Sequence, residues 1–198
     1  MTSILPEHIS IPPESGVPIH AELGASDDRA ADDALEQLYD EHYVRLVRLA
    51  VLLLGEAGRA EEVVQDSFVA VYRRMRRSGG GNAVANAPAY LRQTVVNRSR
   101  SVLRHLKVVA LHPVDAPTHA PGADDDLLHG VRRRQVIDAL ARLPRRQREV
   151  LVLRHYLDLS EREIAATLRI SNGAVKSHAS RGAASLRGNL SQLLEEDA

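Results

Sequence analysis

Apolar residues recur along this chain at steps of three and four, the spacing of helices that bury one face. The pattern predicts one helix over residues 32–54, ended by Gly55, a second over residues 57–77 and a third over residues 88–105. Helices of these lengths can share one small core, so we expect a compact helical module in the N-terminal half. The inward side chains expected on the second helix are Val63, Val64, Ser67, Phe68, Val71 and Met75.

The C-terminal half shows the same spacing with sharper helix boundaries. One helix is predicted over residues 125–143, and residues 143–190 then divide into three short helices. Pro144 suits the first position of a helix, where its missing N–H costs nothing. Ser160 and Glu163 form an S-x-x-E capping box, and Ser171 can cap the helix that follows. Two short helices joined by about four residues are typical of a helix-turn-helix.

The pattern therefore predicts an all-α protein of two small helical domains joined by a flexible linker, the C-terminal domain being a helix-turn-helix. Residues 1–30 contain prolines and acidic residues without a sustained period, which predicts a disordered acidic tail. The first domain is expected over residues 31–105 and the second over residues 126–194. Between them, residues 106–125 contain three prolines and most of a DDD run, so we expect a linker there.

Composition supports helices and excludes several kinds of site. Hydrophobic residues make up 44% of the chain but aromatic residues only 3%, so the cores must be built from Leu, Val, Ile and Ala. The absence of cysteine excludes disulfides, zinc ribbons and thiol catalysis. No apolar run approaches the roughly 18 residues that span a bilayer, and no signal peptide is evident. We therefore expect a cytoplasmic protein with no membrane insertion.

The net charge of zero hides a strong segregation of charge. Residues 1–40 carry nine acids and one arginine, whereas residues 41–104 carry 11 arginines and five acids. Residues 105–130 are again acidic, and residues 131–198 carry 13 basic and eight acidic residues. A single arginine-rich block is more often a solvated surface than a binding site. Two basic blocks, one of them a helix-turn-helix, favour two modules that face nucleic acid.

Three motifs in this order resemble the extracytoplasmic-function, or group IV, sigma factors of bacterial RNA polymerase, of an actinobacterial kind. EEVVQDSF at residues 61–68 resembles the family's E-[ED]-[VL]-[VL]-Q-[DE]-x-F signature. YLRQTVVNRSRSVLRH at residues 90–105 resembles the segment that reads and opens the −10 element. The sequence from Leu143 to Arg187 resembles the domain that reads the −35 element. The resemblance implies domains similar to sigma regions 2 and 4.

The resemblance also implies three sets of functional residues. The family docks an acidic-polar strip on the coiled coil of the polymerase's largest subunit, and the matching residues here are Glu61, Glu62, Gln65 and Asp66, with Phe68 and Val69 as candidate apolar anchors. The −10 set is Asn97, Arg98, Arg100, Ser101 and Arg104. The −35 set is Lys176, Ser177, His178, Ser180 and Arg181. Residues 78–88 resemble the loop that holds a base flipped out of the −10 element.

The resemblance implies core RNA polymerase and promoter DNA as partners, with an anti-sigma factor as a candidate third. It implies no catalytic residue, cofactor or metal. Two alternatives remain at this stage: a stand-alone helix-turn-helix regulator, which would bind duplex DNA tightly by itself, and an adaptor that mimics a sigma factor and titrates an anti-sigma factor. An enzyme is disfavoured because the nine histidines form no metal or nucleophile motif.

Overall fold

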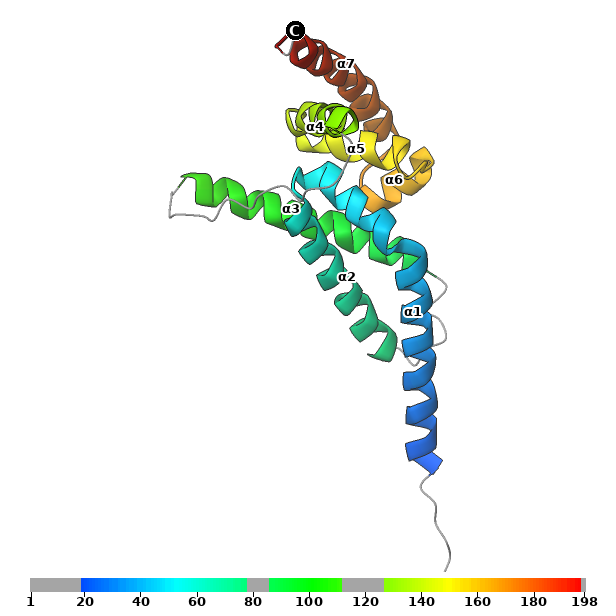
Figure 1. Ribbon diagram of the computed structural model, residues 1–198. Coiled ribbons are helices and arrows are strands. Elements are labelled where there is room, and N and C mark those ends of the chain that lie inside the picture. The colour runs from blue at the N-terminus through cyan, green and yellow to red at the C-terminus, as the bar shows by residue number, and fades with distance from the viewer. Residues whose placement is uncertain (1–18, 78–85, 112–126, 197–198) are drawn as a thin grey trace, which may run out of the picture.

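The computed structural model describes residues 19–77, 86–111 and 127–196, and these ranges contain seven helices and no strand. The prediction of an all-α protein is therefore confirmed. None of the helices in the described ranges is long and apolar enough to cross a bilayer. Figure 1 shows the long first helix running from one end of the molecule toward the C-terminal helices at the other.

Helices α1 (Ile19–Leu54), α2 (Ala57–Arg77) and α3 (Ala87–Leu111) form the N-terminal half. Gly55 ends α1 in a left-handed conformation (φ +85°), with its N–H donating to the Val51 carbonyl at 2.7 Å. Only glycine adopts this conformation without strain. Helix α2 then turns back along α1, and α3 crosses both (Figure 1). The inward face predicted for α2 is confirmed, since all six of its residues are buried.

Helices α4 (Leu127–Ala141), α5 (Arg145–His155), α6 (Glu161–Leu168) and α7 (Asn172–Glu196) form the C-terminal half. The predicted capping box is confirmed: the Ser160 hydroxyl accepts from the Glu163 N–H, and the Glu163 carboxylate accepts from the Ser160 N–H. The Ser160 hydroxyl also donates to the Glu163 carboxylate at 2.6 Å, and this bond, with the one from the Ser160 N–H, holds the pKa of Glu163 below its usual range. Ser171 likewise caps α7 by accepting from the Ala174 N–H at 3.1 Å.

Several predicted helix boundaries are wrong. Residues 19–30, expected in a disordered tail, form the first turns of α1, because their alanines favour a helix and the acidic residues suit its N-terminus. Helix α3 runs on to Leu111, past the expected end at residue 105 and into the predicted linker. Pro144 is the N-cap of α5 and not its first residue. The rest of the predicted linker, residues 112–125, lies outside the described residues.

The two halves pack against each other. Buried side chains from α1, α2 and α3 belong to the same hydrophobic cluster as those from α4, α5, α6 and α7. The contact joins the C-terminal end of α1 to α4 and α5, and joins α3 to α6. The Arg148 guanidinium donates to the carbonyl of Leu53 at 2.7 Å, next to the glycine that ends α1. Burial lowers the pKa of Arg148, which means that the contact removes this cation from water.

We expect Ser160→Ala to lower the free energy of unfolding by about 1 kcal/mol, because it removes the side-chain acceptor at the start of α6. Ser180→Ala on the exposed side of α7 serves as the control and should stay within about 0.5 kcal/mol of the parent chain. Urea denaturation followed by circular dichroism measures both. Equal urea midpoints for the two variants would show that the Ser160 cap contributes nothing to the free energy of unfolding.

Candidate nucleic-acid interface

The turn between α6 and α7 sets the direction in which α7 leaves the core. Arg169 ends α6 in a left-handed conformation (φ 54°, ψ 53°), and Ser171 begins α7 two residues later. Ile164, Leu168 and Val175 are fully buried behind this turn and fix the angle between the two helices. The helix-turn-helix predicted from the capping residues is therefore present. It presents the outer face of α7 to solvent.

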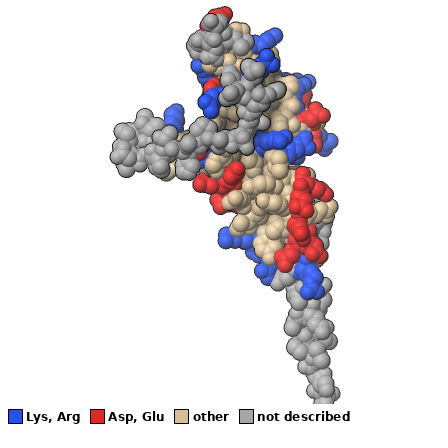
Figure 2. All heavy atoms as spheres, viewed as in Figure 1, with Lys and Arg blue, Asp and Glu red and all other residues tan. Residues whose placement is uncertain are grey.

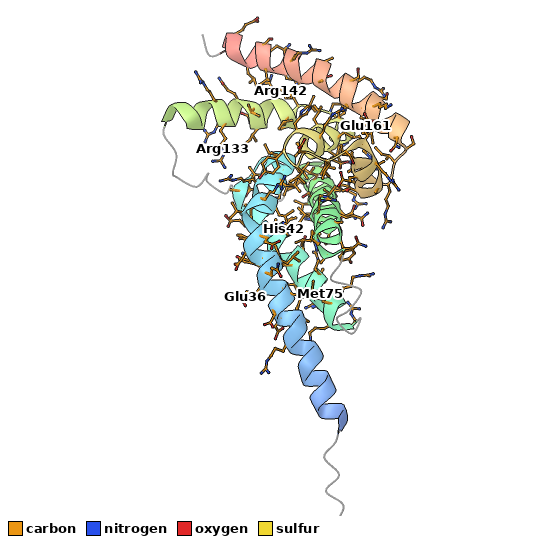
Figure 3. The ribbon with its side chains drawn as sticks, turned by 90° about the vertical axis from the view of Figure 1, so that its right-hand side faces the viewer. Glu36, His42, Met75, Arg133, Arg142 and Glu161 are labelled. Atoms are coloured by element: carbon orange, nitrogen blue, oxygen red, sulfur yellow. The ribbon has the colours of Figure 1, made fainter. Side chains whose placement is uncertain are left out.

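Four of the five residues expected to read the −35 element lie on this outer face. Lys176, Ser177, Ser180 and Arg181 are exposed, at helix positions that share one side. The Arg181 guanidinium donates to the Ser177 hydroxyl at 2.6 Å, so the two side chains are held together. Lys176 lies 3.8 Å from the carboxylate of Glu161, which Figure 3 shows at the start of α6 beside α7. The face offers cationic and hydroxyl groups suited to phosphates and base edges.

His178 lies apart from that face. Its side chain is half-buried, and its Nδ1 atom is buried without a hydrogen-bond partner among the described residues. The helical positions explain this placement, because residue 178 follows the buried Val175 by three positions and precedes the buried Gly182 by four. The sequence pattern grouped His178 with its neighbours in the chain, whereas the structure groups it with the side of α7 that meets the core.

Gly182 lets α7 approach α5 closely. A Cβ atom at this position would lie 3.1 Å from the Cβ of Gln147 and 3.1 Å from the Cδ1 of Leu151. Sequence analysis alone treats a glycine here as a weak point in the helix. In the structure this glycine is buried, and its missing side chain sets the distance between the outer helix and the core.

The residues expected to read the −10 element lie along α3. The Arg98 guanidinium donates to the Asp66 carboxylate at 2.8 Å, and that of Arg104 donates to the Ser101 hydroxyl at 3.2 Å. Asn97 accepts from Arg100 at 3.1 Å. An open cavity of about 320 Å³ lies along this side of α3. It is lined by Tyr90, Gln93, Thr94, Asn97, Arg98, Ser101 and Arg169. Three of the expected residues, Asn97, Arg98 and Ser101, thus line the same cavity as Arg169, a cation in the turn of the helix-turn-helix.

Arg100 differs from the other members of this set. It forms two hydrogen bonds to the carboxylate of Glu149 in α5, at 2.7 and 2.8 Å. Glu149 is one of the few charged residues buried in the described part of the chain. Sequence analysis gave Glu149 no role. The sequence feature that could have drawn attention to Glu149 is the unbroken apolar run that follows it, residues 150–153 in a short helix. Such a run indicates a helix buried on all sides.

The acidic-polar strip on α2 is exposed as expected, with one correction. Glu61, Glu62, Gln65 and Asp66 all face solvent. Phe68, a candidate anchor for a partner, is only 5% exposed, because the rings of Tyr39 and Tyr43 on α1 cover it at centroid distances of 5.3 and 6.2 Å. The remaining apolar candidate, Val69, is 46% exposed.

Charge is arranged differently over the two halves. In the view of Figure 2, acidic side chains form a line along the long first helix, and basic side chains gather over the C-terminal helices. The exposed acids of α1 are Asp32, Asp33, Glu36, Asp40 and Glu41. The molecule therefore offers a negative surface on α1 and α2 and positive side chains on α3 and α7.

Comparison with known proteins identifies the family. The model for sigma-70 region 2 matches residues 38–108, and the model for sigma-70 region 4 matches residues 133–186. The RNA polymerase sigma factor CarQ of Myxococcus xanthus is 32% identical over 82% of this chain and 92% of its own length. The ECF RNA polymerase sigma factor SigL of Mycobacterium tuberculosis is 32% identical over 83% of this chain and 93% of its own. The chain belongs to the extracytoplasmic-function sigma factors.

Solved structures support the same assignment. CnrH, in complex with the cytosolic domain of CnrY, matches with a TM-score of 0.60 and 25% identity, over 89% of this sigma factor and 97% of CnrH. The sigma factor RpoE of Bartonella quintana, in complex with the anti-sigma factor NepR, shares the fold with a TM-score of 0.54. The protein is thus a sigma factor that binds core RNA polymerase and directs it to promoters. Helix α6 and the first part of α7 lie within the region 4 match, and α2 and most of α3 lie within the region 2 match.

The packing of α7 on α5 gives a prediction with an internal control. We expect Gly182→Ala to destabilise the fold by about 1 kcal/mol or more, because the added methyl group crowds Gln147 and Leu151. Gly188→Ala, six residues later in the same helix with no atom within 4 Å of the new Cβ, should stabilise it by about 0.5–1 kcal/mol. Denaturant unfolding of both variants measures the difference. A stabilising effect at both positions would contradict the close approach.

Proposed function

We propose that this sigma factor reads the −35 element through the exposed face of α7 and the −10 element through α3, while the α2 strip docks on the coiled coil of the polymerase's largest subunit. The observation that carries the proposal is the separation of these surfaces by charge. Cationic side chains on α3 and α7 suit phosphates, and the acidic-polar strip on α2 suits a protein partner. A stand-alone regulator needs no such strip.

On α7 the proposed readout uses Lys176, Ser177, Ser180 and Arg181. His178 can join them only if its ring turns away from the core, because one ring nitrogen is buried. On α3, Asn97, Arg98 and Ser101 line the open cavity, where an unstacked base could be held, and Arg104 donates to Ser101. The loop over residues 78–88, expected to capture such a base, lies mostly outside the described residues.

The same proposal divides the chain into a region 2 domain over residues 31–105 and a region 4 domain over residues 126–194. It gives the protein no enzyme activity of its own, because polymerase performs the chemistry while this chain supplies recognition and strand separation. The site of action is the cytoplasm, where polymerase and promoters are. A regulatory partner of the anti-sigma class is also proposed, since the sigma factor RpoE, which shares this fold, was solved in complex with the anti-sigma factor NepR.

Reversing the charge of the outer face tests the assignment of α7. We expect Lys176→Glu with Arg181→Glu to reduce promoter-specific transcription by purified core polymerase at least about tenfold, because each good base contact is worth about 1–3 kcal/mol. Binding to core polymerase should be unchanged, since neither residue lies on the α2 strip. Run-off transcription and a core-binding assay measure the two properties.

Arg29→Glu with Arg132→Glu makes the same change in net charge at two exposed sites on α1 and α4, outside the proposed DNA-reading residues, and it should leave transcription unchanged. Full activity of the Lys176 and Arg181 variant would exclude this face as the −35 reader. It would instead favour the adaptor that titrates an anti-sigma factor. Tight binding of duplex DNA by the parent chain without polymerase would favour the stand-alone regulator.

A further inference from the structure

The last turn of α2 carries an exposed group of cations on one side of the helix. Arg73, Arg74 and Arg77 are all exposed, and their positions fall within about a third of the helix circumference. Arg76 belongs to the same turn but points the other way, with its guanidinium carbon 5.8 Å from the centroid of the Tyr72 ring. We call Arg73, Arg74 and Arg77 the α2 arginine cluster.

The helix dipole alone does not account for the α2 arginine cluster. The C-terminus of a helix carries about half a negative charge, and a single cation in the last turn offsets it. The cluster places three positive charges there. In the part of the chain that the structure describes, no carboxylate pairs with any of the three guanidinium groups. Their charge is therefore available to an anion from outside the chain.

The chain segments next to the cluster carry positive charge and no negative charge. Residues 67–77 contain four arginines, residues 86–111 contain four arginines and one lysine, and neither range contains an acidic residue. The carboxylate of Asp32 on α1 reaches this end of α2, but it accepts from the Tyr72 hydroxyl on the side where Arg76 lies. In Figure 1 the last turn of α2 also points away from the C-terminal helices. The cluster is thus uncovered by the acidic residues and by the helices that pack elsewhere on this half.

The cluster lies beside the open cavity on α3. The guanidinium carbon of Arg74 lies 4.9 Å from the centroid of the Tyr90 ring, and Tyr90 lines that cavity together with Arg98. Arg98 in turn donates to Asp66 of α2 at 2.8 Å. The two contacts are eight residues apart on each helix, so α2 and α3 pass each other in opposite directions and the contacts lie about 12 Å apart along either helix. The cluster and the cavity therefore share one face of this helix pair.

Contacts within the protein orient two of the three guanidinium groups and leave their donors free. A guanidinium that stacks on an aromatic ring keeps its N–H donors in its own plane, where they can bond a phosphate. Arg74 is held in this way on Tyr90. Arg77 donates from Nε to the Arg73 carbonyl at 3.0 Å, which leaves its terminal nitrogens available. Such planar groups match the oxygens of a phosphate in pairs.

We propose that the α2 arginine cluster binds the backbone phosphates of the promoter strand whose base enters the α3 cavity. This inference rests on the proposed function of α3. The acidic-polar strip at the other end of α2 has the opposite charge, so a partner that complements the strip does not suit the cluster. The cluster supplies affinity and fixes the position of the strand without reading its sequence, because phosphates carry no sequence information.

Salt dependence tests the cluster directly, because each phosphate contact releases counterions. For a mixed-sequence DNA single strand of about 12 nucleotides, we expect Arg73→Gln, Arg74→Gln and Arg77→Gln together to reduce the slope of log K against log salt by about 2, at about 0.7 for each contact. Arg73→Gln alone, which removes no described side-chain contact, should reduce it by about 0.7. Fluorescence anisotropy on the full chain measures binding, and circular dichroism verifies folding.

Two further variants serve as controls. Arg29→Gln, Arg132→Gln and Arg134→Gln together remove the same charge at exposed sites on α1 and α4, and they should leave the slope unchanged. Lysine at all three positions of the cluster keeps the charge and should keep most of the slope, although it loses the stacking on Tyr90. An unchanged slope in the glutamine variants of the cluster, or an equal loss in the control on α1 and α4, would overturn the proposal.

Assays with core polymerase separate this inference from the proposed function. The triple glutamine variant of the cluster should give fewer promoter-specific transcripts than the parent chain, while its binding to core polymerase stays unchanged. Weaker binding to core polymerase together with an unchanged salt slope would overturn the proposal and assign the cluster to a protein partner. Absence of specific transcripts from the parent chain would instead refute the proposed function, and the salt slopes would still decide whether the cluster binds phosphates.

Discussion

A buried carboxylate determines how the two halves of this sigma factor fit together. Glu149 lies on a helix that is apolar for its next four residues, and burying a carboxylate there is costly unless cations pair with it. Two arginines of its own helix supply part of that charge, and Arg100 supplies the rest from α3. The pair is directional, and it links α5 to α3.

The remaining features place the binding surfaces around this contact. Gly55 ends α1 where Arg148 can reach the Leu53 carbonyl, and Gly182 lets α7 lie close to α5. The outer face of α7 is open to solvent, whereas Arg100 on α3 is held by Glu149 and Arg169 borders the α3 cavity. The two proposed DNA surfaces thus differ in how far the rest of the chain covers them.

Local features of the fold were predictable because local chemistry determines them. Ser160 with Glu163, Ser171 and Gly55 each mark a helix boundary through a hydrogen bond or a backbone conformation within a few residues. The buried face of α2 followed from periodicity for the same reason. Periodicity predicted that Phe68 faces inward, but it could not predict that two tyrosines of α1 cover its ring and so remove it as an anchor for a partner. His178, grouped with its chain neighbours, faces the core because of where α7 packs.

The contact between the halves was not predictable, because its partners are 49 residues apart and one of them was assigned to DNA on its helix face alone. The residues between the halves suggested a tether, and a tether is compatible with both open and closed arrangements. The run of four apolar residues in α5 was a sequence feature that pointed to neighbours on several sides of this helix. It indicates burial without indicating the partner.

The distance between the halves tests the central claim most directly. Spin labels at Val44→Cys on α1 and Ser185→Cys on α7 would be the only cysteine labels in the chain, and both positions are exposed. Pulsed electron–electron double resonance on the free protein should give one narrow distance distribution, because the buried pair fixes how the halves pack. A broad distribution would contradict a packing that Glu149 determines.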